Sequence, residues 1–308
     1  MKAWIANIQH FNVHDGSGFR TTVFFQGCAL KCKWCQNPEL KSIGPVLMFN
    51  KELCVRCGAC INICKNHAIY ITDNGELETD TKNCIKCFQC EDECYYLARQ
   101  FSSKKMSVNE VYKEVIKDEP FFRRSNGGVT LSGGEPFVQI QFCLSLMKKL
   151  TEIDVSVNVE TAGYVSWRSI EMAVPYVDTF LYDLKLINIK KQLYWVGTDK
   201  TIIIDNLKKL SKIHSHIVIR IPLIPRINDT DEEFEAMMKF LDTLEKIQAI
   251  HILPFHQLGS LKYELIREKY EMVDIEVNNQ ERIKACVKIA KQHGYLVDIG
   301  GSAFTNAV

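Results

Sequence analysis

The second part of the chain, from about residue 103 onward, alternates short apolar runs with amphipathic segments. The amphipathic stretches predict helices, among them residues 139–150, 231–246 and 279–293. Ser107 and Glu110 form a capping-box pattern that predicts the start of another helix. The apolar runs predict strands at residues 128–132, 155–159, 179–185, 217–222, 249–254 and 295–299. This alternation predicts an α/β fold of parallel strands covered by helices, as either a barrel or an open sheet.

Polar side chains stand where several of these strands are predicted to end. They are Glu135, Glu160, Asp183, Lys185, Arg220 and His256, with the pair Gly133 and Gly134 just before the first. In parallel α/β folds the active groups gather at the C-terminal ends of the strands. We therefore expect these residues to share one site, although a surface ion pair at Asp183 and a structural histidine are the plainer alternatives.

Bulk composition narrows the class of protein without defining it. The 308 residues are 46% apolar and 24% charged, with a net charge of +1. These values are ordinary for a globular protein and give no reason to expect a nucleic-acid or membrane partner. We find neither an apolar run long enough to span a bilayer nor a secretory signal, so the expected compartment is the cytoplasm.

The cysteines depart from this ordinary composition. Of 13 in the chain, eleven fall between Cys28 and Cys94, which in a chain without secretory features indicates metal binding. Cys28, Cys32 and Cys35 have the spacing C-x3-C-x2-C and can bind three corners of a [4Fe–4S] cluster, leaving one iron open. The alternative is a zinc knuckle that lacks one of the usual four ligands.

The other eight cysteines repeat one spacing twice, C-x2-C-x2-C-x3-C. The first half comprises Cys54, Cys57, Cys60 and Cys64, and the second comprises Cys84, Cys87, Cys90 and Cys94. This spacing is that of bacterial two-cluster ferredoxins, where the fourth cysteine of each half serves the other cluster. One predicted cluster thus takes Cys54, Cys57, Cys60 and Cys94, and the other takes Cys84, Cys87, Cys90 and Cys64. Two zinc sites are the alternative.

The first cysteine group and the Gly133-Gly134-Glu135 run together resemble the radical S-adenosylmethionine superfamily. The resemblance implies that the open iron binds S-adenosylmethionine and that its reductive cleavage gives a 5′-deoxyadenosyl radical. It implies further that Trp34 lies near the adenine and that the glycines with Glu135 hold the methionine amino group. By the same resemblance Asp183 and Lys185 lie at the carboxylate end, and Glu160, Arg220 and His256 line the pocket.

The segment His14-Asp15-Gly16-Ser17-Gly18-Phe19-Arg20 resembles the H-D-G-P-G-x-R motif of glycyl radical enzyme activating enzymes. That resemblance implies a protein substrate, a glycyl radical enzyme, from which one glycine hydrogen is removed. It implies that Asp15, Gly16, Gly18 and Arg20 contact this partner. Three [4Fe–4S] clusters are then expected, the two auxiliary ones either relaying electrons from a flavodoxin or ferredoxin or only shaping the docking surface.

The same resemblance implies a partial (β/α)6 TIM-like barrel interrupted by a ferredoxin-like module. Residues 1–48 would begin the barrel, 49–102 would form the module and 103–308 would complete the barrel. Two other functions stay open at this point. One is a radical S-adenosylmethionine enzyme with a small-molecule or different protein substrate, and the other is a ferredoxin-like electron carrier with an inert barrel.

Overall fold

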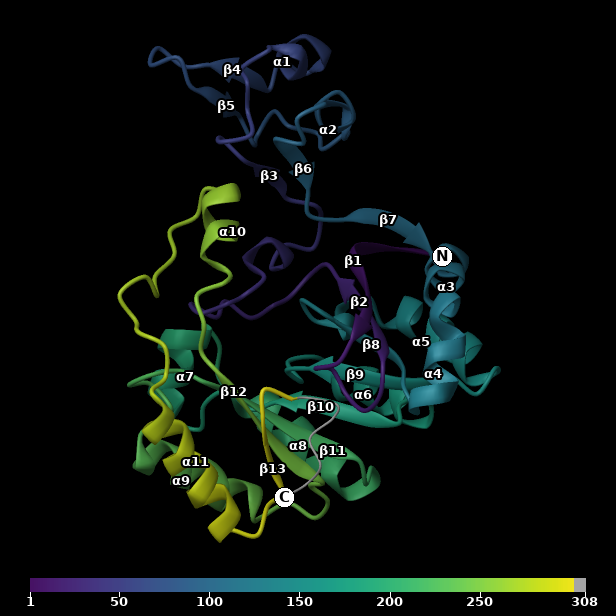
Figure 1. The fold of residues 1–308 in the computed structure, drawn as a ribbon, viewed down its shortest axis with the longest axis vertical. Coiled ribbons are helices and arrows are strands. Elements are labelled where there is room, and N and C mark those ends of the chain that lie inside the picture. Colours follow the sequence, from purple (N-terminus) through teal and green to yellow (C-terminus); the bar gives the residue numbers. More distant parts are fainter. Residues whose placement is uncertain (302–308) are drawn as a thin grey trace.

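The computed structural model describes residues 1–301, so the last residues of the predicted segment 103–308 lie outside the described part. One nine-stranded sheet dominates it, with the strand order β13-β12-β11-β10-β9-β8-β2-β1-β7 (Figure 1). Its strands are β1 (Lys2–Asn12), β2 (Arg20–Phe25), β7 (Lys104–Ser107), β8 (Gly128–Gly133), β9 (Ser156–Thr161), β10 (Thr179–Asp183), β11 (Ile217–Leu223), β12 (Ala249–Pro254) and β13 (Val297–Ile299). Neighbours from β2 and β8 through β13 pair in parallel, and β1 pairs antiparallel with both β2 and β7. The structure is therefore an α/β fold with a mostly parallel, open sheet.

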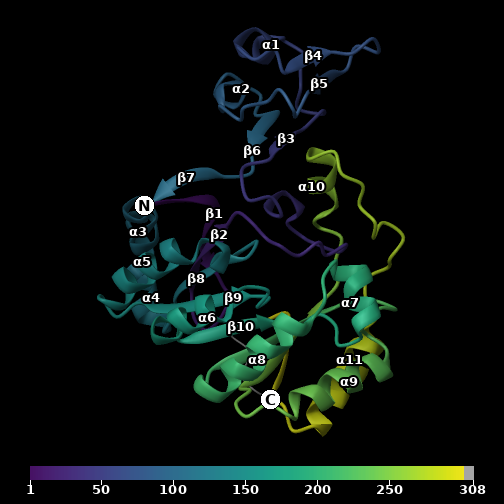
Figure 2. The ribbon, with the colours of Figure 1, turned by 180° about the vertical axis from the view of Figure 1, so that it is seen from behind.

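Helices connect the parallel strands and lie around the outside of the sheet (Figures 1 and 2). They are α3 (Val108–Val115), α4 (Glu119–Ser125), α5 (Ile140–Thr151), α6 (Trp167–Ala173), α7 (Ile189–Val196), α8 (Thr201–Ile213), α9 (Asp231–Leu241), α10 (Ser260–Leu265) and α11 (Gln280–Gln292). Short 3-10 turns occur at η1 (Pro38–Leu40), η2 (Ile116–Asp118), η3 (Pro136–Gln139) and η4 (Val174–Tyr176). Within the described residues, no helix is both long and apolar enough to cross a bilayer.

The elements predicted from periodicity are confirmed, with small shifts at their ends. The capping box is complete, since the Ser107 hydroxyl accepts from the Glu110 backbone N–H and the Glu110 carboxylate accepts from the Ser107 backbone N–H. The helix predicted to reach residue 246 ends at Leu241 instead. There the chain turns toward β12, and the Thr243 hydroxyl caps the carbonyl of Phe240 at 2.7 Å.

Residues 47–101, between β2 and β7, form a small second body at the top of Figure 1. It contains β3 (Leu47–Phe49), α1 (Ala59–Ile63), β4 (Ile69–Ile71), β5 (Leu77–Thr79), α2 (Gln89–Asp92) and β6 (Arg99–Phe101). Its apolar side chains form a cluster separate from that of the main sheet, centred on Phe49, Ile69, Leu77 and Phe101. Antiparallel pairing of β3 with β6 brings the two ends of this body together. We call residues 47–101 the cysteine-rich body.

Candidate functional site

The loop that carries Cys28, Cys32 and Cys35 follows the C-terminal end of β2. Backbone hydrogen bonds hold it on both sides: Cys28 N–H donates to Lys41 O at 3.2 Å, and Lys31 N–H donates to Val196 O on α7 at 2.9 Å. Burial raises the pKa of Cys28 to about 12 and that of Cys32 to about 11. These thiols are thus neutral unless a metal displaces their protons.

The three thiols open into one cavity at the C-terminal ends of the parallel strands. The cavity is also lined by most of the residues predicted from the strand ends, namely Gly133, Gly134, Glu160, Asp183, Lys185, Arg220 and His256, and by Trp34 of the cysteine loop. Asp15 lines it as well, although its motif predicted a contact with a partner. The structure therefore brings together, in one place, residues that are more than two hundred positions apart in the chain.

Gly133 and Gly134 are required by the backbone that lies against them. A Cβ at Gly133, where φ is +113°, would lie 2.3 Å from the backbone nitrogen of Phe25. A Cβ at Gly134 would lie 2.3 Å from the carbonyl oxygen of Gly27. The two glycines thus let the end of β8 approach the start of the cysteine loop, which fixes the distance between that loop and the sheet.

Glu135 is buried behind this turn, with 2% of its surface exposed. Its carboxylate accepts hydrogen bonds from the Thr161 hydroxyl at 2.9 Å and from the Ala162 backbone N–H at 3.0 Å. Burial raises the pKa of Glu135 to about 7, against the opposing effect of these hydrogen bonds. These neighbours orient the carboxylate, and a cationic group nearby would stabilise its charged form.

Arg220 joins two carboxylates across the sheet. Its Nη1 lies 3.2 Å from Glu160 Oε1 and 3.3 Å from Asp15 Oδ1. The Ser132 hydroxyl donates a further hydrogen bond to Glu160 at 2.5 Å. Burial raises the pKa of Glu160 and Arg220 opposes that rise, so the carboxylate depends on the guanidinium for its charge.

Asp183 and Lys185 form an ion pair, with Lys185 Nζ 2.6 Å from Asp183 Oδ2. Their side chains are only 16% and 11% exposed, so the alternative of a surface ion pair is wrong. Burial lowers the pKa of Lys185, but the carboxylate of Asp183 outweighs it and the net pKa is raised. Asp183 Oδ1 is buried and has no hydrogen-bond partner among the described residues, so this carboxylate can still accept from a ligand.

Trp34 and His256 border the same cavity differently. Trp34 is buried and lies against Trp195, with 6.4 Å between the ring centroids. His256 is exposed and lies two residues beyond the end of β12, and its backbone carbonyl accepts from the Gln36 amide at 3.0 Å. Both residues line the cavity and can therefore contact a ligand there.

The motif at residues 14–20 makes contacts that its sequence does not predict. Arg20, predicted to contact a partner, is 0% exposed, and its guanidinium donates to Thr130 Oγ1 and Val129 O, each at 2.7 Å. Its side chain holds the loop to β8 and is covered by the protein's own chain. Gly16 and Gly18 have positive φ values of +124° and +67°, and a side chain at either would collide with Asn158 or with the backbone of Ser125.

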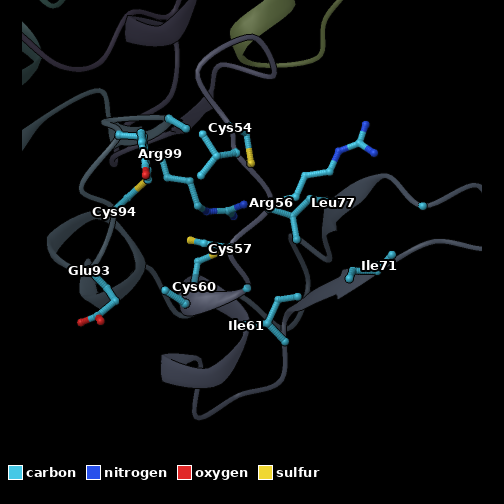
Figure 3. Close-up of a pocket in the computed structure, with 16 residues that line it drawn as sticks. Cys54, Arg56, Cys57, Cys60, Ile61, Ile71, Leu77, Glu93, Cys94 and Arg99 are labelled. Carbon is cyan, nitrogen blue, oxygen red and sulfur yellow. The ribbon is translucent and has the colours of Figure 1, made fainter.

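The eight cysteines of the cysteine-rich body line two further cavities. One is lined by Cys54, Cys57, Cys60 and Cys94. The other is lined by Cys64, Cys84, Cys87 and Cys90. Figure 3 shows the first of them, with Cys94 reaching it from the second half of the repeat (Figure 3). Each cavity is thus lined by three cysteines from one half of the repeat and one cysteine from the other half.

Three residues at these sites escaped the sequence analysis. Tyr263 on α10 donates to the carbonyl of Cys35 at 3.1 Å, and Lys41 lines the large cavity. Arg99 lines both smaller cavities. None of them belongs to a local pattern, and only the folded chain brings them to the cysteines.

This arrangement, three loop cysteines facing a strand-end cavity, has a counterpart in known proteins. The model of the radical SAM superfamily matches residues 22–241, which is most of the chain. The main sheet also resembles the crystal structure of a radical SAM methyltransferase from Sphaerobacter thermophilus, with a TM-score of 0.51 and 15% identity over 64% of this chain and 58% of that one. The class is therefore that of radical S-adenosylmethionine enzymes, whose members bind S-adenosylmethionine and a [4Fe–4S] cluster.

Two relatives define the group within that class. A trans-4-hydroxy-L-proline dehydratase activating enzyme from Clostridioides difficile is 38% identical over 98% of this chain and 100% of its own length. An isethionate sulfite-lyase activating enzyme from Oleidesulfovibrio alaskensis is 35% identical over 93% of this chain and 94% of its own. The chain belongs to the radical SAM activating enzymes of glycyl radical enzymes.

Proposed function

We propose that this enzyme cleaves S-adenosylmethionine reductively and removes one hydrogen atom from a backbone glycine of a partner glycyl radical enzyme. The observation that carries the proposal is the convergence of Cys28, Cys32 and Cys35 with the strand-end polar residues on one cavity. The relatives named as activating enzymes support the same reaction. The chemistry supplied by the bound cluster and S-adenosylmethionine is the formation of a 5′-deoxyadenosyl radical.

The residues present fit these two groups. The three thiols supply the ligands for three irons of a [4Fe–4S] cluster. Gly133 and Gly134 line the cavity, and with Glu135 buried behind them they would hold the methionine amino group. The unpartnered Asp183 Oδ1 and the remaining N–H groups of Lys185 would contact the carboxylate end.

The wall of the cavity would complete the pocket for S-adenosylmethionine. Trp34 would face the adenine, and Glu160, Arg220 and His256 would line the remaining wall. By holding S-adenosylmethionine against apolar and ion-paired walls, these residues would exclude water from the radical.

The loop at residues 14–20 is part of the proposed partner surface. Because Arg20 is covered and Asp15 faces the cavity, we propose that the loop acts through the shape that Gly16 and Gly18 permit. The partner's glycine-bearing segment would lie along this backbone and reach the cavity beside Asp15. This assigns Arg20 the task of holding the loop in place.

The cysteine-rich body is proposed to be a ferredoxin-like module, residues 49–102. It would be inserted in a partial (β/α)6 barrel that residues 1–48 begin and residues 103–308 complete. Its crossed cysteine sets would hold two auxiliary [4Fe–4S] clusters, one with Cys54, Cys57, Cys60 and Cys94 and the other with Cys84, Cys87, Cys90 and Cys64. They would relay electrons from a flavodoxin or ferredoxin to the Cys28 cluster. The proposed compartment is the cytoplasm, where thiols remain reduced.

The reaction is tested with anaerobically reconstituted protein, dithionite and S-adenosylmethionine. We expect 5′-deoxyadenosine, together with a glycyl radical signal in electron paramagnetic resonance when the cognate partner is present. Hydroxyproline dehydratase and isethionate sulfite-lyase begin the panel of partners, and the triple variant C28A/C32A/C35A is the control. Deoxyadenosine without a glycyl radical on any partner would favour a different substrate, and redox-active iron without deoxyadenosine would favour an electron carrier.

A further inference from the structure

Arg99 on β6 is a buried cation that forms no ion pair with a carboxylate among the described residues. Only 1% of its surface is exposed, and β6 pairs it with Phe49, whose ring centroid lies 5.2 Å from the guanidinium carbon. The guanidinium donates one hydrogen bond, from Nη2 to the Thr79 hydroxyl. Nε and Nη1 are buried and have no partner among the described residues. A buried charge with unused donors is costly unless something else in the molecule compensates it.

The place of Arg99 identifies that compensation. It lines both the cavity of Cys54, Cys57, Cys60 and Cys94 and the cavity of Cys64, Cys84, Cys87 and Cys90. Figure 3 shows its side chain reaching in among the cysteines of the first cavity. Cysteine thiolates and the sulfides of an iron–sulfur cluster are anionic hydrogen-bond acceptors, which are the groups that an unpaired guanidinium requires.

We propose that Arg99 is a charge shared by the two auxiliary clusters, and that it raises the reduction potential of both by donating hydrogen bonds to their sulfur atoms. This rests on the proposed function, in which both cavities hold [4Fe–4S] clusters. Each cluster gains one negative charge when it accepts an electron. A nearby fixed positive charge therefore stabilises the reduced form more than the oxidised form, and the potential rises.

A shared cation also couples the two clusters. When one cluster is reduced, its added negative charge offsets the field of Arg99 that the other cluster experiences. The second electron then enters less readily than the first, so the pair passes single electrons onward. This behaviour suits a relay toward a reaction that consumes one electron at a time.

The test is a redox titration of the holoenzyme followed by electron paramagnetic resonance, comparing wild type with Arg99→Met and Arg99→Lys. Added S-adenosylmethionine identifies the Cys28 cluster, because it alters that signal alone. In Arg99→Met we expect both auxiliary potentials to fall, with at least about a tenfold lower ratio of reduced to oxidised cluster at fixed potential, or about 59 mV. Arg99→Lys keeps the charge and should keep most of the potential, and the Cys28 cluster should be unchanged in both variants.

Arg267 provides a matched control. Its guanidinium carbon lies 5.5 Å from the same Phe49 ring, but it pairs with the Glu78 carboxylate and lines neither cysteine cavity. Arg267→Met should leave both auxiliary potentials in place. Equal shifts in Arg267→Met and Arg99→Met would overturn the proposal, since any lost charge would then suffice.

Two further results separate this inference from the proposed function. If Arg99→Met does not retain its clusters, Arg99→Gln is compared with Arg99→Lys, and potentials in Arg99→Gln equal to wild type reject the role of Arg99. If Arg99→Met retains both auxiliary clusters and their reduction potentials equal those of wild type, the role of Arg99 is rejected and the proposed function is not. Wild-type protein that holds iron for only one cluster rejects the auxiliary clusters themselves, and the present inference with them.

Discussion

Arg220 on β11 and Glu160 on β9 meet across the end of β10, with 3.2 Å between Nη1 and Oε1. Nη1 of the same arginine also lies 3.3 Å from Asp15. One guanidinium thus neutralises two carboxylates, one from the loop at residues 14–20 and one from β9.

Replacing Arg220 by Met should leave Glu160 and Asp15 buried without a counter-charge. We expect the free energy of unfolding to fall by about 3–5 kcal/mol, the range for breaking one partner of a buried ion pair. The affinity for S-adenosylmethionine should fall with it. Denaturant unfolding and calorimetric titration measure the two effects.

Lys239 and Glu235 form a suitable control pair, with 3.8 Å between charged atoms and a Lys239 side chain that is 70% exposed. Lys239→Met should change the unfolding free energy by no more than about 0.5 kcal/mol. If Arg220→Met has the same free energy of unfolding as Lys239→Met, the ion pairs of Arg220 do not stabilise the fold.

Glu135 should make the stability of the iron-free protein depend on pH. Its pKa of about 7 lies above the ordinary value of 4.5, so the folded protein binds the proton more tightly than the unfolded chain. The stabilisation is complete below about pH 4.5 and is lost as the pH rises through about 7, by on the order of 3 kcal/mol.

Glu135→Gln carries no titrating proton at this position and should lose that part of the pH dependence. Urea unfolding of both proteins across this pH range gives the difference. If the unfolding free energies of wild type and Glu135→Gln change with pH in parallel, the carboxyl of Glu135 does not titrate in this range.

The crossed grouping of cysteines predicts which double variants lose the same iron. Cys94 and Cys57 line one cavity, whereas Cys87 lines the other. Cys94→Ala combined with Cys57→Ala should therefore lose one cluster, and Cys94→Ala combined with Cys87→Ala should lose two. Iron analysis of the anaerobic proteins measures this. The opposite pattern would mean that each half of the repeat holds its own cluster.

These cysteine variants also test the proposed relay. With Cys57 and Cys87 both replaced by Ala, the Cys28 cluster should be reduced more slowly by a flavodoxin or ferredoxin. Stopped-flow absorbance follows the reduction. An unchanged rate would leave the cysteine-rich body with a docking role only.

Tyr263 should stabilise the cysteine loop through its bond to the Cys35 carbonyl. Tyr263→Phe removes this hydrogen bond from a buried position, at a cost of about 1 kcal/mol. We expect faster loss of iron from the Cys28 cluster to a chelator and a slower release of deoxyadenosine. Tyr70→Phe, on an exposed part of the cysteine-rich body, should match wild type. Equal rates of iron loss from Tyr263→Phe and Tyr70→Phe would show that Tyr263 does not stabilise the cysteine loop.

Local patterns were sufficient for much of the main sheet. The strand at Ala249–Pro254 and the cap at Ser107 depend on neighbouring residues, which the sequence displays directly. Arg20 could not be predicted in this way. Arginine is rarely buried without an exposed end, and the acceptors that bury it belong to β8, whose register against β2 is set by the whole sheet.

Long-range contacts account for the other omissions. Tyr263 reaches Cys35 across 228 residues of sequence. In the sequence, Arg99 is one charged residue in a strand. In the folded chain it lines both cysteine cavities. Physical contacts of this kind leave no periodicity, so only the structure reveals them.

The pairing of β3 with β6 bears on how such a chain is assembled and how it evolves. The main sheet places β2 beside β8, although the whole cysteine-rich body separates them along the chain. Because β3 and β6 close the ends of that body on each other, they shorten the effective loop between β2 and β8, and the entropy of joining these strands changes little. A lineage can therefore acquire, exchange or shed the entire cysteine-rich body while the main sheet keeps its folding route.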